Sequence, residues 1–109
     1  MIVTAWNNGQ WHKTGAGYGV KINPEDRDRF FKENWETITL TFEGSTTKVN
    51  VNIAKKSFWS PTCHELINSQ IGRWLQSNRL APWTKGNPPK LWLEPLSDRV
   101  FLLRRITPK

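Results

Sequence analysis

The fold of this chain is decided by residues 37–53, which read TITLTFEGSTTKVNVNI. Apolar residues alternate with threonine in the first half and with lysine or asparagine in the second, which is the period of two of a half-buried strand. The Glu-Gly-Ser sequence at residues 43–45 is typical of a turn, because glycine tolerates backbone conformations that other residues resist. We therefore expect a β-hairpin with one apolar face.

The residues before the hairpin predict two strands and a helix. Residues 2–6 are expected to form a short strand, and residues 18–22 form a second because Tyr18, Val20 and Ile22 alternate with other residues. Residues 23–26 read NPED, which supplies an N-cap, a proline for the first turn and acids for the positive end of the helix dipole. A short helix should follow to about Phe31 and bury Phe30 or Phe31.

The residues after the hairpin predict one more helix and a closing hairpin. Residues 65–78 have apolar side chains at helical spacing, with Ser60 or Thr62 as the expected cap. Residues 83–89 are rich in proline and glycine and predict a loop, whereas residues 91–93 and 100–103 predict paired strands. With no βαβ rhythm, we expect one domain over residues 1–109, mainly β with two short helices (α+β), as a small seven-stranded open pseudobarrel.

The charge balance indicates a polyanionic partner. Sixteen Lys and Arg against nine Asp and Glu give a net charge of +7, and residues 71–109 carry eight of the bases but only two of the acids. Residues 44–64 and 66–93 contain no acid. A field of this sign attracts nucleic acid first and an anionic membrane second. The alternative is a small basic protein whose charges are merely solvated.

Several classes of protein are disfavoured by what the sequence lacks. One cysteine excludes an internal disulfide, and no Cys or His spacing suggests zinc, so we expect no metal and a cytoplasmic or nucleoid-associated protein. No targeting segment or membrane-length apolar run is present, and no motif predicts a cofactor. Adjacent Cys63 and His64 offer a poor catalytic geometry, so we expect no enzyme.

Three stretches carry a family resemblance: residues 7–31, a polar loop running into a strand and a Pro-started helix; residues 35–59, a hairpin followed by a basic-aromatic loop; and residues 71–101, which contain IGRWL and LWLEPL. Their order resembles the DNA-binding pseudobarrel family, namely the B-three domains of plant transcription factors and the effector domains of EcoRII-like and BfiI-like restriction enzymes. The Arg-rich N-terminal arm of the plant members is absent. The resemblance implies sequence-specific binding of double-stranded DNA through two loops that enter the major groove. We expect a monomer or a weak dimer.

Carried onto this sequence, the two loops are residues 7–14 and 55–64, and they should lie near one another at one rim of the barrel. Amide side chains match the adenine edge, whereas lysines donate to guanine or phosphate. The candidate DNA-binding residues are Asn7, Asn8, Gln10, Trp11, His12, Lys13, Thr14, Asn52, Lys55, Lys56, Ser57, Phe58, Trp59, Ser60, Thr62, His64 and Arg73.

The aromatic residues divide by position. Loop residues Trp11, Phe58 and Trp59 are expected to be exposed, where they can pack on a thymine methyl or stack on an unpaired base. Core positions are expected for the indoles in or beside the elements, which are Trp6, Trp35, Trp74 and Trp92. Phosphate contacts are expected from the basic residues of the C-terminal third, which are Arg73, Arg79, Lys85, Lys90, Arg104 and Arg105.

Two further functions stay open. The first is an RNA- or modified-base-binding module, similar to those associated with pseudouridine synthases, in which aromatics stack on an exposed base. Alternatively, the tryptophan-rich surface is the hot spot of a protein-interaction or inhibitor protein.

Overall fold

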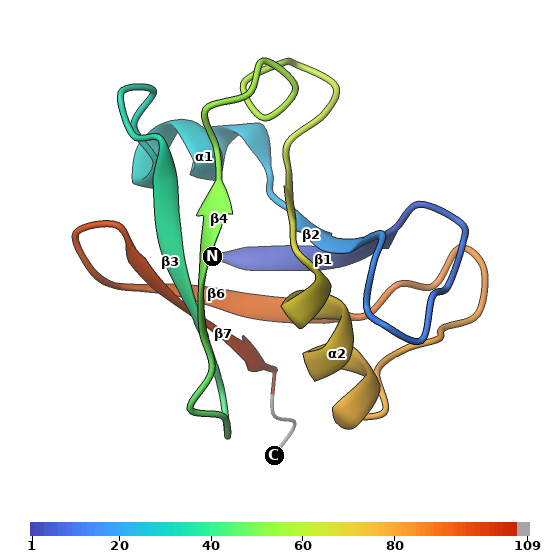
Figure 1. Ribbon diagram of the computed structural model, residues 1–109. Helices are drawn as coiled ribbons and strands as arrows, with labels where there is room; N and C mark the ends of the chain where they lie inside the picture. Colours follow the sequence, from blue (N-terminus) through green and yellow to red (C-terminus); the bar gives the residue numbers. More distant parts are fainter. Residues whose placement is uncertain (107–109) are drawn as a thin grey trace.

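The computed structural model describes residues 1–106, which form one seven-stranded sheet and two helices (Figure 1). In chain order the elements are β1 (Ile2–Asn7), β2 (Tyr18–Lys21), α1 (Pro24–Phe30), β3 (Thr37–Phe42), β4 (Lys48–Asn52), β5 (Glu65–Ile67), α2 (Ser69–Ser77), β6 (Lys90–Ser97) and β7 (Val100–Arg105). The strand order is β4-β3-β7-β6-β1-β2-β5, and the edge strands β4 and β5 approach each other, so the barrel nearly closes. The predicted fold class, mainly β with two helices in a small pseudobarrel, is confirmed.

The predicted hairpin is formed by β3 and β4. Ile38 pairs with Val51 and Leu40 with Val49, so the alternating apolar residues share the inner face. Strand β3 continues the sheet by pairing in parallel with β7, whereas the other neighbouring strands are antiparallel. The hairpin therefore builds one wall of a core that the remaining strands complete.

Helix α1 begins as its sequence predicts. The side-chain oxygen of Asn23 accepts a hydrogen bond from the amide of Glu25 at 3.0 Å, and Pro24 occupies the first turn. Phe31, directly after the helix, is buried and stacks on Phe101 with ring centroids 4.7 Å apart. The helix thereby closes one end of the barrel.

The helix predicted for residues 65–78 is only partly right. Glu65–Ile67 is strand β5, because its backbone pairs with the free edge of β2 from Gly19 to Lys21. The helix starts after Asn68, whose side chain accepts from the amide of Gln70 at 2.8 Å, so the predicted caps Ser60 and Thr62 are wrong. Three residues are too few for helical and strand periods to be told apart.

The tryptophans expected in the core divide into two pairs. Trp35 and Trp74 are buried, as predicted, whereas Trp6 and Trp92 are only half-buried. Strand alternation explains the second pair, since the buried neighbours Ala5 and Leu93 occupy the inner face. Within residues 1–106, no helix has the length and apolar character needed to span a bilayer.

Candidate nucleic-acid interface

Strands β6, β1, β2 and β5 present a continuous outer face. Thr4 of β1 lies opposite both Lys21 of β2 and Lys90 of β6, and the Lys90 ammonium donates to the Thr4 hydroxyl at 2.8 Å. In the next row, Trp6 lies opposite Gly19, which lies opposite Ile67. The residues between these positions are buried, so both rows point away from the core. We call the outward side of these four strands the outer face.

Two loops bound the outer face. The β1–β2 loop (residues 8–17) enters β2 at Tyr18, and the β4–β5 loop (residues 53–64) enters β5 at Glu65. Because β2 and β5 are antiparallel, the loops lie at opposite ends of one two-strand ladder, so the expectation that they share one rim of the barrel is wrong (Figure 1). The four residues of β2 separate the points at which the loops join this ladder by about 10–13 Å, at a strand rise of about 3.3 Å per residue. The major groove of B-DNA is about 12 Å wide.

Helix α2 braces the β1–β2 loop. The Arg73 guanidinium donates through Nε to the carbonyl of Thr14 at 3.0 Å, and the Gln76 amide donates to the carbonyl of His12 at 2.9 Å. Gly15 packs directly on the helix, where an added Cβ would lie 2.1 Å from the Ser69 carbonyl oxygen. Arg73 therefore holds the loop backbone, in addition to any contact it makes with DNA.

Asparagine side chains form the turns inside the β1–β2 loop. The Asn7 Oδ1 accepts from the amide of Gly9 at 2.7 Å, and the Asn8 Oδ1 accepts from the amide of Gln10 at 3.0 Å. The backbone N–H of Asn8 donates to the carbonyl of Gly17 at 2.9 Å and closes the base of the loop. With these oxygens engaged, the Nδ2 group of exposed Asn8 remains as a donor toward a ligand.

The tip of the β1–β2 loop is open to solvent. The side chains of Gln10, His12, Lys13 and Thr14 are exposed, and Trp11 is 37% exposed. Trp11 has a φ of 52°, in the left-handed region that costs a residue with a side chain about 1–2 kcal/mol. Its ring packs edge-on against Trp83 and Tyr18, and these contacts offset that cost.

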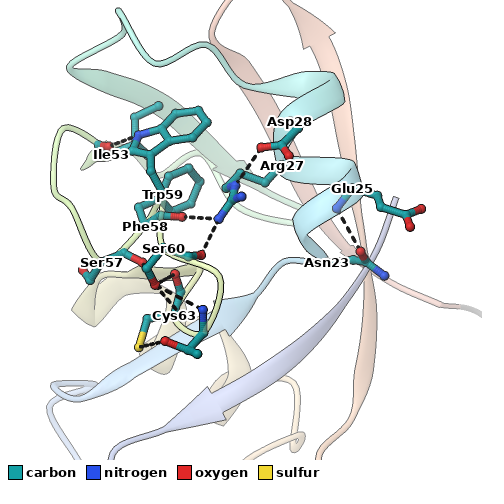
Figure 2. Close-up of polar contacts among 11 residues, drawn as sticks. Asn23, Glu25, Arg27, Asp28, Ile53, Ser57, Phe58, Trp59, Ser60 and Cys63 are labelled. Atoms are coloured by element: carbon teal, nitrogen blue, oxygen red, sulfur yellow. Dashed lines mark hydrogen bonds and ion pairs between the residues drawn. The ribbon is translucent and has the colours of Figure 1, made fainter.

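Helix α1 braces the β4–β5 loop through Arg27 (Figure 2). The guanidinium donates through Nη1 to the carbonyls of Phe58 at 3.0 Å and Ser60 at 2.7 Å, and through Nε to the Asp28 carboxylate at 3.0 Å. Its Cζ also lies 5.5 Å from the centroid of the Trp59 ring. Arg27 itself is 6% exposed, so these bonds form largely out of water. Each loop thus has its own helix as a support.

Three of the residues expected to contact DNA in the β4–β5 loop serve the loop itself. Phe58 is fully buried against Phe31, so the prediction that it is exposed is wrong. The indole of Trp59 donates to the Ile53 carbonyl at 2.8 Å, and the Ser60 hydroxyl accepts from the amide of Cys63 at 2.8 Å. Trp59 and Ser60 remain half-buried and therefore keep part of their surface available.

The remaining candidates of this region differ in exposure. Lys56, Ser57, Thr62 and Asn52 are exposed, Lys55 is half-buried, and the Asn52 Oδ1 accepts from the amide of Ala54 at 2.9 Å. His64 is 8% exposed, and its Nδ1 has no hydrogen-bond partner within residues 1–106. Burial makes His64 a poor direct contact for a duplex.

Ion pairs engage two of the arginines that the sequence predicted to contact phosphate. Within the described chain the ion pairs join Arg27 to Asp28, Arg104 to Glu94 and Arg105 to Glu43. Hydrogen bonds from the Arg105 amide and guanidinium lower the pKa of Glu43 below its usual 4.5. Two expected phosphate contacts, Arg104 and Arg105, are therefore engaged on β7, whereas the interface lysines form no ion pair with a carboxylate among residues 1–106. These lysines are Lys13, Lys21, Lys55, Lys56 and Lys90.

Sequence reasoning missed Lys21 and Arg27. Lys21 had a usable signal, since it is the polar member of an alternating strand and so faces outward. Arg27 had none, because its partners lie 31 and 33 residues further along the chain. The contribution of Arg27 depends on tertiary contacts alone.

The side chains of Cys63 and His64 do not form a nucleophile–base pair in the structure. Cys63 is exposed while the adjacent His64 is buried, and no hydrogen bond between their side chains occurs in the described residues. Residues 1–106 contain no group of three or more His, Cys, Asp or Glu that could hold a metal ion. Comparisons with protein-family models, curated proteins and solved structures find no match for this chain.

Proposed function

We propose that this chain binds double-stranded DNA without cleaving it, with the β1–β2 and β4–β5 loops entering the major groove and the outer face between them. The observation that carries the proposal is the arrangement of the loops. They join one ladder at points whose separation is close to the width of a major groove, and each is braced by a helix. Loops held in one conformation lose less entropy on binding than mobile loops do.

The lysines supply the affinity in this proposal. Lys13 and Lys56 project from the two loops, Lys55 begins the second loop, and Lys21 and Lys90 lie on the outer face. Ammonium groups that neutralise phosphates release counterions, which stabilises the complex regardless of sequence. Glu65 lies opposite Lys21 on this surface, and Asp26 lines the same pocket as Lys21 and Lys90.

The tips of the loops supply the specificity. Asn8 and His12 are exposed in the β1–β2 loop and carry donors that can reach base edges. Duplex RNA is a poorer fit, because the major groove of an A-form helix is deep and too narrow for side chains to read. A braced loop suits B-form DNA better than either duplex RNA or a flexible single strand.

The test is fluorescence anisotropy with the full chain against a labelled random-sequence DNA duplex and an RNA duplex of the same length. We expect DNA to bind more tightly, and the double variant Lys55→Ala/Lys56→Ala to bind all DNA sequences about tenfold more weakly. Lys48→Ala is the control, because Lys48 is also exposed but lies at the other end of β4. In selections from a random DNA pool, the Asn8→Ala and His12→Ala variants should prefer different sequences from those that the unsubstituted chain prefers. Equal binding by the double variant and the control, or tighter binding of RNA, would overturn the proposal.

A further inference from the structure

An apolar pocket adjoins the base of the β1–β2 loop. It has a volume of about 710 Å³, and its walls include Asn7 and Trp11 on one side and Pro82, Trp83 and Lys85 on the other. Volumes of about 300–1,000 Å³ are typical of pockets that hold small organic ligands. The pocket lies between two loops that Figure 1 shows next to each other, and contact between the Trp11 and Trp83 rings confirms that placement.

Three aromatic rings meet at this pocket. The centroids of Trp11 and Trp83 are 4.8 Å apart with their planes at 75°, and Tyr18 lies 5.9 Å from the first and 6.0 Å from the second. Tyr18 is buried, whereas Trp11 is 37% exposed and Trp83 is half-buried. The two indoles and the proline therefore offer flat apolar surface to a ligand.

One polar group beside the pocket has no partner. The Asn7 Oδ1 accepts from the amides of Gly9 and Trp11, but its Nδ2 is enclosed and makes no hydrogen bond within residues 1–106. An enclosed donor without a partner is unfavourable, and an acceptor on a ligand would reach this one only if the Asn7 side chain or its loop moved. Lys85 adds a positive charge at the pocket.

These features select a class of ligand. Aromatic pockets also bind quaternary ammonium groups, but Lys85 and the net charge of +7 disfavour a cation here. A planar heterocycle with an attached phosphate suits the indoles and the lysine together. We propose that the pocket takes a nucleobase turned out of the duplex that the two loops hold. This inference rests on the proposed function, since Trp11 lies in the β1–β2 loop that would enter the groove and Asn7 directly precedes that loop.

The experiment compares two labelled DNA duplexes that differ only in one unpaired central adenine, again by anisotropy with the full chain. Stacking of a base on an aromatic side chain should make the duplex with the bulge bind about tenfold more tightly. Trp83→Ala should abolish this preference while the fully paired duplex is still bound. Trp11→Asn, whose side chain tolerates a left-handed backbone, should do the same. Trp92→Ala is the control, because Trp92 lies outside the pocket, and it should leave the preference for the bulge unchanged.

Each result has a distinct meaning. No preference for the bulge, with the paired duplex still bound, overturns the base pocket and leaves the proposed function standing. If Trp83→Ala and Trp11→Asn weaken binding to the two duplexes equally, the base pocket is also overturned, because the rings would then contact the paired part of the duplex. Displacement of the bulged duplex by micromolar adenosine monophosphate would overturn the turned-out base in favour of a free nucleotide. Absence of binding to either duplex would overturn the proposed function.

Discussion

Nη1 of Arg27 lies 2.7 Å from the carbonyl oxygen of Ser60, 33 residues further along the chain. This bond, with a second one to Phe58, ties helix α1 to the β4–β5 loop across the end of the barrel (Figure 2). Helix α2 holds the β1–β2 loop in the same manner through Arg73. The shape of the proposed interface therefore depends on two arginines that fix loop backbones.

Removing the first of these should loosen both the fold and the loop. Arg27→Ala leaves the carbonyls of Phe58 and Ser60 without their donor, and buried groups that lose a partner cost about 1–3 kcal/mol. We expect urea denaturation to show a loss in that range, and the β4–β5 loop to become more sensitive to proteases. Arg29→Ala in the same helix is the control, because Arg29 is exposed, and it should change stability by less than about 0.5 kcal/mol. Equal losses for the two variants would contradict the bracing role.

Gly72→Ala should destabilise the protein although alanine is the better helix former. Intrinsic propensity favours alanine inside a helix by about 1 kcal/mol. An added Cβ at residue 72 would, however, lie 2.5 Å from the Gly15 carbonyl oxygen and 2.7 Å from the Tyr18 ring. We expect a net loss of about 1–3 kcal/mol, measured by thermal or urea unfolding, as in other overpacked cores.

Ser69→Ala in the same helix is the control for that substitution, since Ser69 is exposed and should change stability little. If Gly72→Ala is more stable than the unsubstituted protein, the prediction is wrong and the β1–β2 loop moves to accommodate the added methyl group at little cost.

The salt dependence of DNA binding should report which lysines contact phosphate. Contacts from all five interface lysines give a slope of log K against log salt of about −4 to −5. Lys13→Ala and Lys56→Ala should each make the slope shallower by about 1. Arg105→Ala should leave the slope unchanged, because Arg105 pairs with Glu43 on β7. A shallower slope for Arg105→Ala would move the interface toward β7.

Glu43 should contribute stability above its ordinary titration range. Its pKa is lower in the folded than in the unfolded protein. The contribution is therefore fully present above about pH 4.5 and is lost as the pH falls through the pKa of the folded state. Glu43→Gln should therefore destabilise the protein at pH 7 by up to about 1 kcal/mol, the range of solvent-screened ion pairs. Unfolding curves of the two proteins should converge toward acidic pH. A constant difference between pH 7 and pH 3 would show that the charge is not the cause.

The local elements were predictable because their causes are local. Alternation in residues 37–53 and the Asn23-Pro24 start of α1 depend on neighbours in the chain, and both predictions are confirmed. The exposed tip of the β1–β2 loop followed from its polar, glycine-containing sequence. The residue types of the candidate site, which are amides and lysines, could likewise be identified from the sequence.

Tertiary contacts decided the rest. Residues 65–67 became a strand because β2 offered an unpaired edge, and Phe58 became core because Arg27 folds its loop inward. The sequence alone determined the alternating strands, the turn of the β3–β4 hairpin and the start of α1, since those depend on periodicity and capping. Only the folded chain determined which loops share a ladder, which cations keep their charge unpaired and which aromatic rings meet, because these depend on bonds between residues far apart in the chain.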